Sequence, residues 1–355
     1  MKFIHTADLH LGAKNEAKLS PDRARLRRAE LLDTFDRIAE LAECEGAAVL
    51  IAGDLFDTAH PSRQTVGAVI ATIRRHPAVR FFCLPGNHDG GKFPTDDVPE
   101  NLSLFSERLT VFSLGDVDIY GTTETDSALY DALRPDPDRK NILLLHGTVK
   151  DGGTPEAGAV VLSRLADRGL DYLALGHYHF HRITPLDARG ICAYCGTPEG
   201  RGMDEAGECG VLLFDTDECP IRPRFIKTAR RTIHRFPLEI ASDADPADTE
   251  RRVRDALGGI PREDLVRIEL TGRILPDAPR PNTERMTELF GKGFFYLEIR
   301  DHTRPDIRPE QYADSLTLKG EFVRRVMAKE GLTDGERDAI LQAGLAALRG
   351  EGDEI

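Results

Sequence analysis

Short apolar runs that end abruptly in a polar cluster recur along the first half of the chain, and they constrain the fold more than any other feature. Each run has four or five residues and is bounded by Gly, Pro or Asp, a pattern typical of buried β-strands. Apolar residues at helical spacing lie between the first three runs, with Gly46 suited to a helix end and Ser62 to a helix start. Strands that alternate with helices predict an α/β fold with a largely buried sheet. The runs are Phe3–Ala7, Ala48–Ala52, Phe81–Leu84, Ile142–Leu145 and Tyr172–Leu175.

The pattern divides the 355 residues into three parts. Residues 1–228 are expected to form the catalytic domain, and residues 229–300 a small β-α-β module that caps its cleft. Residues 301–355 begin with a Pro-broken link and continue with two helix-like segments whose apolar residues suit docking of a partner.

The chain is acidic: Lys and Arg number 47, Asp and Glu number 60, and the net charge is −13. This balance disfavours a protein that coats nucleic acid non-specifically, because phosphate binding relies on cations. A local basic face or bound divalent metals can still attract nucleic acid into a cleft. The N-terminus MKFIHTADLH lacks the apolar core of a signal peptide, and no run approaches about 18 apolar residues. The sequence therefore predicts a cytoplasmic protein without a membrane span.

Six cysteines occur, and two of them, Cys192 and Cys195, form a CxxC pair. Disulfides are not expected in a cytoplasmic chain. Zinc binding by this pair is disfavoured because the segment ICAYCG reads as a strand, where positions three apart point to opposite faces. We expect ordinary buried thiols.

Each predicted strand delivers a ligand-type side chain at its C-terminal end, the edge where ligands collect in open α/β sheets. These side chains supply oxygen and imidazole nitrogen and no thiolate, a mixture that suits Mn²⁺, Fe or Zn²⁺ in a hydrolytic site. Seven donors are too many for one tetrahedral ion and suit two ions that share a bridging ligand. Asp54, in a tight Gly-Asp turn, is the expected bridge. The candidate metal ligands are Asp8, His10, Asp54, Asn87, His146, His177 and His179.

This set of residue types predicts a reaction class. Two metal ions about 3.5–4 Å apart stabilise the attacking and the leaving oxygens of a phosphoryl displacement. A metal-bound water ionises near neutral pH, so a metal-bound hydroxide is the expected nucleophile. The departing oxygen still requires a proton, and His88 is placed by its motif to act as the general acid. The sequence thus predicts a dinuclear metal-dependent phosphodiesterase.

The ordered motifs DLH, GDLFD, GNHD, HG and GHYH resemble those of the calcineurin-like metallophosphoesterase superfamily. Within it, KFIHTADLHLG is similar to the SbcD-type DNA-repair nucleases, bacterial relatives of the meiotic recombination nuclease. The segments GTPEGRGMDEAGECGVLLFD and YLEIRDHTRPDIRPEQYADSLTLKGEFVRR extend the resemblance to the YhaO-like exonucleases over most of the chain. The resemblance implies a layered β-sandwich core flanked by helices, a small α+β capping domain and C-terminal helices.

The same resemblance implies roles for individual residues. His88 would protonate the leaving group or hold the phosphate, and Mn²⁺ is favoured over Fe, Zn²⁺ or Mg²⁺. Asp57 departs from the family pattern, because eukaryotic and archaeal members usually have His there. Its role stays open between substrate positioning and orientation of a metal ligand through an outer hydrogen bond. The implied ligands are Asp8, His10, Asp54 and His179 for one metal, and Asp54, Asn87, His146 and His177 for the other.

Other polar residues have simpler interpretations. His5 lies within the first strand and suits a core histidine, His181 suits the surface or a substrate groove, and Asp89 suits a role in fixing the GNHD turn. Two basic runs suit either a solvated face or contacts with the DNA backbone. The arginines considered for DNA contact are Arg23, Arg25, Arg27, Arg28, Arg230 and Arg231.

The favoured function is hydrolysis of double- or single-stranded DNA by an exonuclease or endonuclease. The same chemistry also suits a phosphoprotein, a nucleotide or a cyclic nucleotide, because a fold does not settle its substrate. A third hypothesis makes the chain chiefly a partner-binding subunit. The resemblance implies an SMC-like ATPase of the SbcC type as that partner, docked through the C-terminal helical pair, and a homodimer is a further option.

Overall fold

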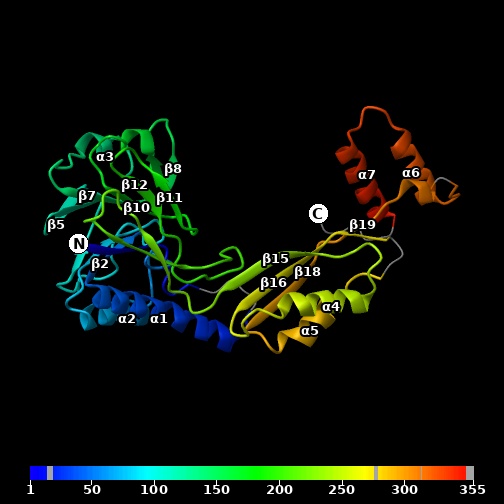
Figure 1. Ribbon diagram of the computed structural model, residues 1–355, viewed down its shortest axis with the longest axis horizontal. Coiled ribbons are helices and arrows are strands. Elements are labelled where there is room, and N and C mark those ends of the chain that lie inside the picture. The colour runs from blue at the N-terminus through cyan, green and yellow to red at the C-terminus, as the bar shows by residue number, and fades with distance from the viewer. Residues whose placement is uncertain (14–18, 276–278, 313, 349–355) are drawn as a thin grey trace. The chain divides into compact units, whose positions relative to one another are not determined.

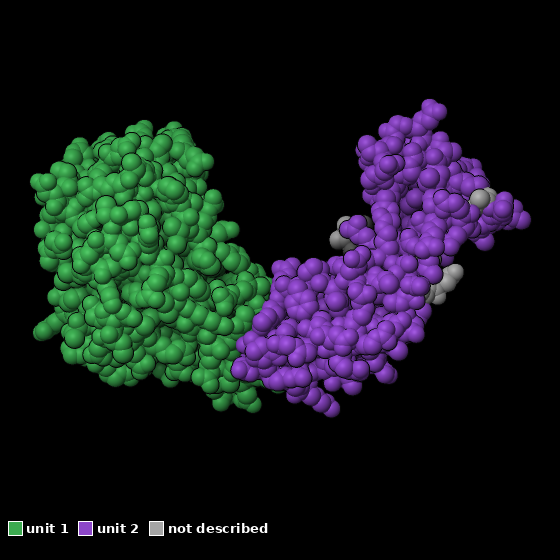
Figure 2. Space-filling view, viewed as in Figure 1, with its two compact units in different colours: residues 1–233 green, residues 234–355 purple. Residues whose placement is uncertain are grey.

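The computed structural model describes residues 1–13, 19–275, 279–312 and 314–348, and it divides into two compact units, residues 1–233 and 234–355 (Figure 2). The domain boundaries expected at residues 228 and 300 stay predictions, and residues 349–355 of the expected C-terminal helical pair lie outside the described residues. Within the described ranges, no helix is both long enough and apolar enough to cross a membrane.

The first unit contains two six-stranded mixed sheets. The central strands of each sheet are parallel. Antiparallel strands form both edges of the second sheet and one edge of the first, whose other edge strand pairs in parallel. The strands of the first sheet are, in spatial order, β14 (Arg224–Lys227), β13 (Gly210–Asp215), β1 (Lys2–Thr6), β2 (Ala47–Ala52), β3 (Phe81–Leu84) and β4 (Leu102–Leu104). Those of the second are β11 (Arg182–Pro185), β12 (Ile191–Tyr194), β10 (Tyr172–Gly176), β7 (Lys140–His146), β6 (Val117–Gly121) and β5 (Thr110–Leu114).

The two sheets pack face to face, because alternate side chains of their strands share one core. Phe3 and Leu50 of the first sheet belong to the same buried cluster as Ile142 and Ala174 of the second. The opposite face of the first sheet packs against α1 (Pro21–Glu45) and α2 (Arg63–Arg75), and that of the second against α3 (Ser127–Ala132) (Figure 1). The expected layered sandwich flanked by helices is confirmed.

Local sequence explains where the first two helices begin and end. The Ser20 side chain accepts from the Arg23 amide at the start of α1, and Gly46 ends the helix with φ at 62°, in the left-handed region that glycine adopts without strain. Ser62 accepts from the Thr65 amide in the same way at the start of α2. The expected roles of Gly46 and Ser62 are confirmed.

The segment between β7 and β10 contains the short pair β8 (Thr148–Lys150) and β9 (Ala159–Val161), followed by η1 (Leu162–Arg164). The second unit is built on a three-stranded sheet of β15 (Ile233–Glu239), β16 (Leu265–Thr271) and β18 (Tyr296–Asp301). Its core includes side chains of α4 (Pro246–Leu257) and α5 (Thr283–Gly291). Side chains of the last two helices share a small apolar cluster. The remaining elements are β17 (Arg273–Ile274), β19 (Arg304–Pro305), η2 (Pro309–Tyr312), α6 (Leu318–Ala328) and α7 (Asp334–Ala347).

A buried charge cluster ties α1 to the loop after β12. Arg27 is 1% exposed, and its guanidinium donates to Glu30 at 2.5 Å and to Glu199 at 2.9 Å. Arg231 is also buried and donates to Glu30 at 2.6 Å. Each guanidinium is occupied by buried carboxylates, so the expected DNA contact is wrong for Arg27 and Arg231. The other four of the six arginines considered for DNA contact are exposed, and their contacts with DNA stay predictions. These four are Arg23, Arg25, Arg28 and Arg230.

We expect Arg27→Ala to lower the free energy of unfolding by about 3–5 kcal/mol, because it leaves buried carboxylates without their partner. Guanidinium chloride unfolding measures the change. Arg28→Ala, one residue along the same helix and exposed, is the matched control and should change stability by less than about 0.5 kcal/mol. Equal stability of the two variants would contradict a structural role for Arg27.

Candidate metal centre

The ends of β1 and β2 are joined by backbone hydrogen bonds that bring two ligand loops together. The Asp8 amide donates to the Gly53 carbonyl at 3.1 Å, and the His10 amide donates to the Asp54 carbonyl at 3.0 Å. Asp8, His10 and Asp54 all have φ between 45° and 52°, and His177 has φ of 97°. Such backbone is costly for residues other than glycine and persists where the surroundings impose it. Only one other described non-glycine residue, Asp167, has positive φ, so this strain is concentrated at the candidate ligands.

Five of the seven candidate ligands fall into two overlapping groups that share Asp8. Donor atoms of Asp8, His10 and His179 all lie within 4.8 Å of one another, and so do those of Asp8, Asp54 and His146. Oδ2 of Asp54 lies 3.7 Å from Nε2 of His10 and 3.3 Å from Nε2 of His146, one histidine from each group. This position between the groups supports the expected bridging role of Asp54.

The second group is completed by an amide and a further imidazole. Nε2 of His146 lies 3.0 Å from Oδ1 of Asn87, and the rings of His146 and His177 are 5.3 Å apart. His177 sits on the turn after β10, and its amide donates to both carboxylate oxygens of Asp8, at 2.9 and 3.0 Å. The turn that carries His177 is therefore fixed directly to Asp8, the residue that the two groups share.

The chemistry of these donors fits a divalent cation. Nδ1 of His146 donates to the Ala52 carbonyl at 2.9 Å, which leaves Nε2 as the ring nitrogen that faces the oxygens of Asp54 and Asn87. Burial lowers the pKa of His146, but the hydrogen bond and charge of Asp54 outweigh it and raise the pKa to about 9. Nε2 of His10 is buried and has no hydrogen-bond partner among the described residues. Acceptor atoms thus converge on a place that favours positive charge.

Glycines make this convergence sterically feasible. A Cβ on Gly53 would lie 2.0 Å from Nδ1 of His146, and a Cβ on Gly86 would lie 2.2 Å from Oδ1 of Asp54. The glycine that precedes a ligand in the GD and GN motifs is therefore required by close packing of the next ligand loop.

His88 lies at the exposed rim of the group. Its amide donates to Oδ1 of Asp54 at 2.9 Å, and its Nδ1 lies 3.0 Å from the carbonyl oxygen of Asp57. A carbonyl only accepts, so Nδ1 carries a hydrogen and Nε2 is the atom able to pass a proton to a substrate. Asp89 accepts from the amides of Leu55, Phe56 and Gly86 and so fixes the GNHD turn against the GDLFD loop.

Carboxylates hold two of the ligand histidines from behind. Oδ1 of Asp57 lies 3.3 Å from Nδ1 of His10, a position that supports the orienting role left open for Asp57. Oε1 of Glu205 lies 2.7 Å from Nδ1 of His179. Arg201 links the two carboxylates, at 2.7 Å from Glu205 and 3.3 Å from Asp57. Burial raises the pKa of Glu205, but the contacts with His179 and Arg201 outweigh it and lower the pKa to about 2.

Sequence reasoning missed Glu205 and Arg201. Both lie in the segment GTPEGRGMDEAGEC, which follows a predicted strand and is buried over much of its length. A charged pair inside a glycine-rich segment of this kind was the available signal. The targets of this pair could not be read from the sequence, because they are distant and follow no regular spacing. Glu205 lies 26 positions after His179, and Arg201 lies 144 positions after Asp57.

The remaining candidates occupy ordinary positions. His5 is buried, with Nδ1 3.0 Å from the Tyr172 hydroxyl, and His181 is exposed and stacks on Phe225. Cys192 and Cys195 belong to different cores on opposite faces of the second sheet, as expected for positions three apart on an extended chain. No cysteine takes part in a candidate metal group among the described residues.

The sequence profile of calcineurin-like phosphoesterases matches residues 1–181, the stretch that carries all seven candidate ligands. The chain belongs to this family.

The DNA double-strand break repair protein Mre11 of Sulfurisphaera tokodaii is 26% identical over 242 residues, which cover 62% of this chain and 61% of that protein. Mre11 of Archaeoglobus fulgidus is 26% identical over 347 residues, covering 84% of this chain and 74% of the relative. The uncharacterized metallophosphoesterase YhaO of Bacillus subtilis is 29% identical over 233 residues, covering 60% and 57%. The chain therefore spans less than two thirds of the Sulfurisphaera and Bacillus relatives.

We expect Glu205→Gln to weaken Mn²⁺ binding by about 10- to 100-fold, because the carboxylate no longer fixes the ring of His179. Isothermal titration calorimetry of the metal-free protein measures the affinity. Glu208→Gln, an exposed change three residues away, is the control and should bind Mn²⁺ like the unmodified protein. Unchanged affinity in a correctly folded Glu205→Gln variant would rule out the orienting role.

Proposed function

We propose that this chain is a metal-dependent phosphodiesterase that hydrolyses DNA in double-strand break repair. The observation that carries the proposal is the convergence of Asp8, Asp54 and four histidines at adjoining strand ends, with His88 on the exposed rim. Family membership supports hydrolysis of a phosphate ester, and similarity to the DNA double-strand break repair protein Mre11 supports DNA as the substrate.

The proposed metal sites follow the two groups of donors. Two divalent ions, with Mn²⁺ favoured, would when bound polarise the phosphate and activate water. The strained backbone at Asp8, His10 and Asp54 holds their side chains in place before substrate arrives, so little reorganisation accompanies the reaction. The proposed ligands are Asp8, His10, Asp54 and His179 for one ion and Asp54, Asn87, His146 and His177 for the other.

The chain's own contribution to bond cleavage is a proton at His88. The Asp57 carbonyl fixes the ring through Nδ1, which leaves Nε2 directed away from that contact. When the phosphorus–oxygen bond breaks, the leaving oxygen takes a proton from Nε2 of the imidazolium form of His88, which becomes a neutral ring that keeps its hydrogen on Nδ1. The amide of His88 donates to Asp54, so the proposed general acid is held beside the proposed bridging ligand.

We expect His88→Ala to lower the turnover of bis-p-nitrophenyl phosphate by about a hundred- to ten-thousand-fold, because the leaving oxygen loses its acid. Initial rates at saturating Mn²⁺ measure the loss, and calorimetry should show that Mn²⁺ still binds. His60→Ala, an exposed histidine outside the candidate groups, is the control. Near-normal turnover in His88→Ala would overturn the proposed acid.

Substrate class is settled by comparing several phosphate esters with one preparation. Hydrolysis of end-labelled duplex and single-stranded DNA and of bis-p-nitrophenyl phosphate, with little activity on p-nitrophenyl phosphate, supports a DNA phosphodiesterase. Preference for a phosphopeptide, a nucleotide or a cyclic nucleotide would favour the alternative substrate class. Closed circular DNA separates endonuclease from exonuclease action, because it offers no end.

We propose further that α6 helps to dock an SMC-like ATPase of the SbcC type. The segment leading into α6 carries Leu316, which is 99% exposed, and Leu318, which is 70% exposed. Neighbouring exposed apolar residues of this size are typical of a protein contact.

We expect the double change Leu316→Glu and Leu318→Glu to weaken co-purification with an SMC-like ATPase of the SbcC type, because the contact would bury charge. Ser315→Glu, an adjacent polar position, is the control. Phosphodiesterase activity on bis-p-nitrophenyl phosphate should stay unchanged in both variants. Unaltered association would place the docking surface elsewhere.

A further inference from the structure

The turn that carries two candidate metal ligands also presents two exposed aromatic rings. In the segment His177–Phe180, histidines alternate with Tyr178 and Phe180. Tyr178 is 52% exposed and Phe180 is 45% exposed, and their ring centroids lie 5.8 Å apart. Two neighbouring, exposed aromatic rings beside the candidate metal ligands contribute little to the core. Exposed apolar side chains that cluster in this way often mark a binding surface.

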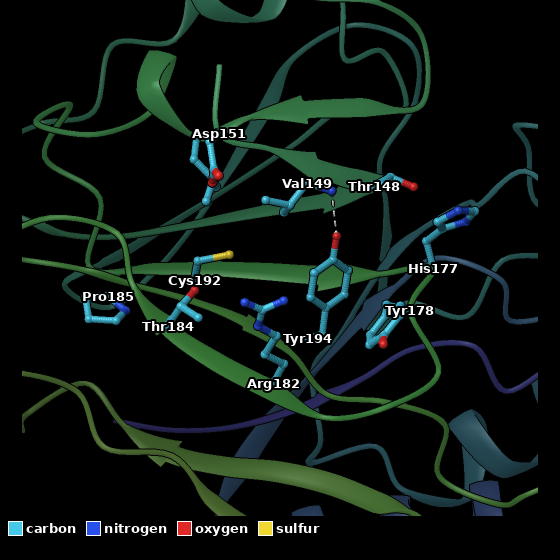
Figure 3. A pocket seen from close by; sticks show the side chains of 11 residues that line it. Thr148, Val149, Asp151, His177, Tyr178, Arg182, Thr184, Pro185, Cys192 and Tyr194 are labelled. Atoms are coloured by element: carbon cyan, nitrogen blue, oxygen red, sulfur yellow. Dashed lines mark hydrogen bonds between the residues drawn. The ribbon is translucent and has the colours of Figure 1, made fainter. Parts of the chain in front are cut away.

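Tyr178 forms one side of a pocket of about 440 Å³ that begins at His177 (Figure 3). Its ring meets the ring of Tyr194 edge to face at 5.7 Å. Tyr194 is itself fixed, because its hydroxyl accepts from the Val149 amide at 2.9 Å and donates to the Gly147 carbonyl at 2.7 Å. The pocket is therefore rigid on one side, and its size lies within the range of sites that hold a nucleotide-sized ligand.

A cation completes the pocket. Arg182 lies opposite Tyr194 in the pairing of β11 with β12, and Figure 3 shows its side chain beside the Tyr194 ring. The side chain of Arg182 makes no hydrogen bond or ion pair with the described residues, unlike the side chains of the buried Arg27 and the linking Arg201. An unpaired guanidinium next to aromatic rings suits a phosphate or the edge of a base.

We propose that this pocket holds the unpaired base of the nucleotide next to the phosphate under attack, stacked on Tyr178 and contacted by Arg182. This inference rests on the proposed function, because it takes the phosphate to lie at the group that includes His177. A base inside a duplex is stacked on both faces and cannot enter a protein pocket, so the pocket selects a single-stranded end or a base splayed from the helix. The alternation of His177, Tyr178 and His179 thus directs ligands to the phosphate and a ring to the base.

The test is binding of single-stranded oligonucleotides in the presence of EDTA, measured by fluorescence anisotropy. The oligonucleotides carry 2-aminopurine at one end or the other, so that stacking on a ring also changes the fluorescence of the base. We expect Tyr178→Ala and Arg182→Ala each to weaken binding by about 5- to 100-fold and Tyr178→Ala to remove the fluorescence change. Tyr178→Phe keeps the ring and should keep both signals.

The matched control is Ile183→Ala. Ile183 is exposed on the same strand as Arg182 but points to the opposite face, and it does not line the pocket. It should bind the oligonucleotides like the unmodified protein. Equal binding by Tyr178→Ala and the control would overturn the inference, and so would loss of the 2-aminopurine signal in Tyr178→Phe.

The two proposals fail in different ways. Suppose that the unmodified protein hydrolyses DNA and prefers single-stranded to duplex ends, and that Tyr178→Ala shows the same preference. The base-binding role of the pocket is then wrong, and the proposed function stands. If the unmodified protein hydrolyses no DNA and binds no oligonucleotide, the proposed function fails and this inference fails with it. Binding without hydrolysis would retain the pocket and remove only the proposed reaction.

Discussion

The pairing of the β1 and β2 ends is the constraint on which the rest of the site depends. Two backbone hydrogen bonds, from Asp8 to Gly53 and from His10 to Asp54, force residues other than glycine into left-handed backbone. This conformation turns the side chains of both loops toward one place above the sheet. Hydrogen bonds from the His177 amide to Asp8 and from the His88 amide to Asp54 then fix two further loops against the first two.

Electrostatics explains why this arrangement of side chains favours a cation. Asp8 and Asp54 are buried beside imidazole rings, and buried anions are costly unless positive charge compensates them. Partners behind the rings decide which nitrogen faces the centre: the Ala52 carbonyl for His146 and Glu205 for His179. Arg201 lies between Glu205 and Asp57, so a single cation outside the centre positions carboxylates behind two different ligands.

Much of the first unit could be predicted because its signals are local. A run of four or five apolar residues identifies a buried strand, and a polar residue just after it must lie at the carboxyl edge of the sheet. The contacts of Arg27 show the limit of this reasoning. Arg27 lies four residues before the buried Leu31, on the apolar side of α1, so its burial had a local signal, but its partner Glu199 lies 172 residues away. The arginines near the start of α1 therefore suggested a single exposed face, although only some of them are exposed to solvent.

The sequence by itself determined the strands, the donor types and their order, because each depends on neighbours within a few positions along the chain. Only the tertiary structure decided which carboxylate stands behind which histidine, which arginines are buried, and that Tyr178 and Arg182 share a pocket with Tyr194. Those relations join residues from different loops and strands, and side-chain contact across such separations follows from how the sheets pack rather than from any spacing in the sequence.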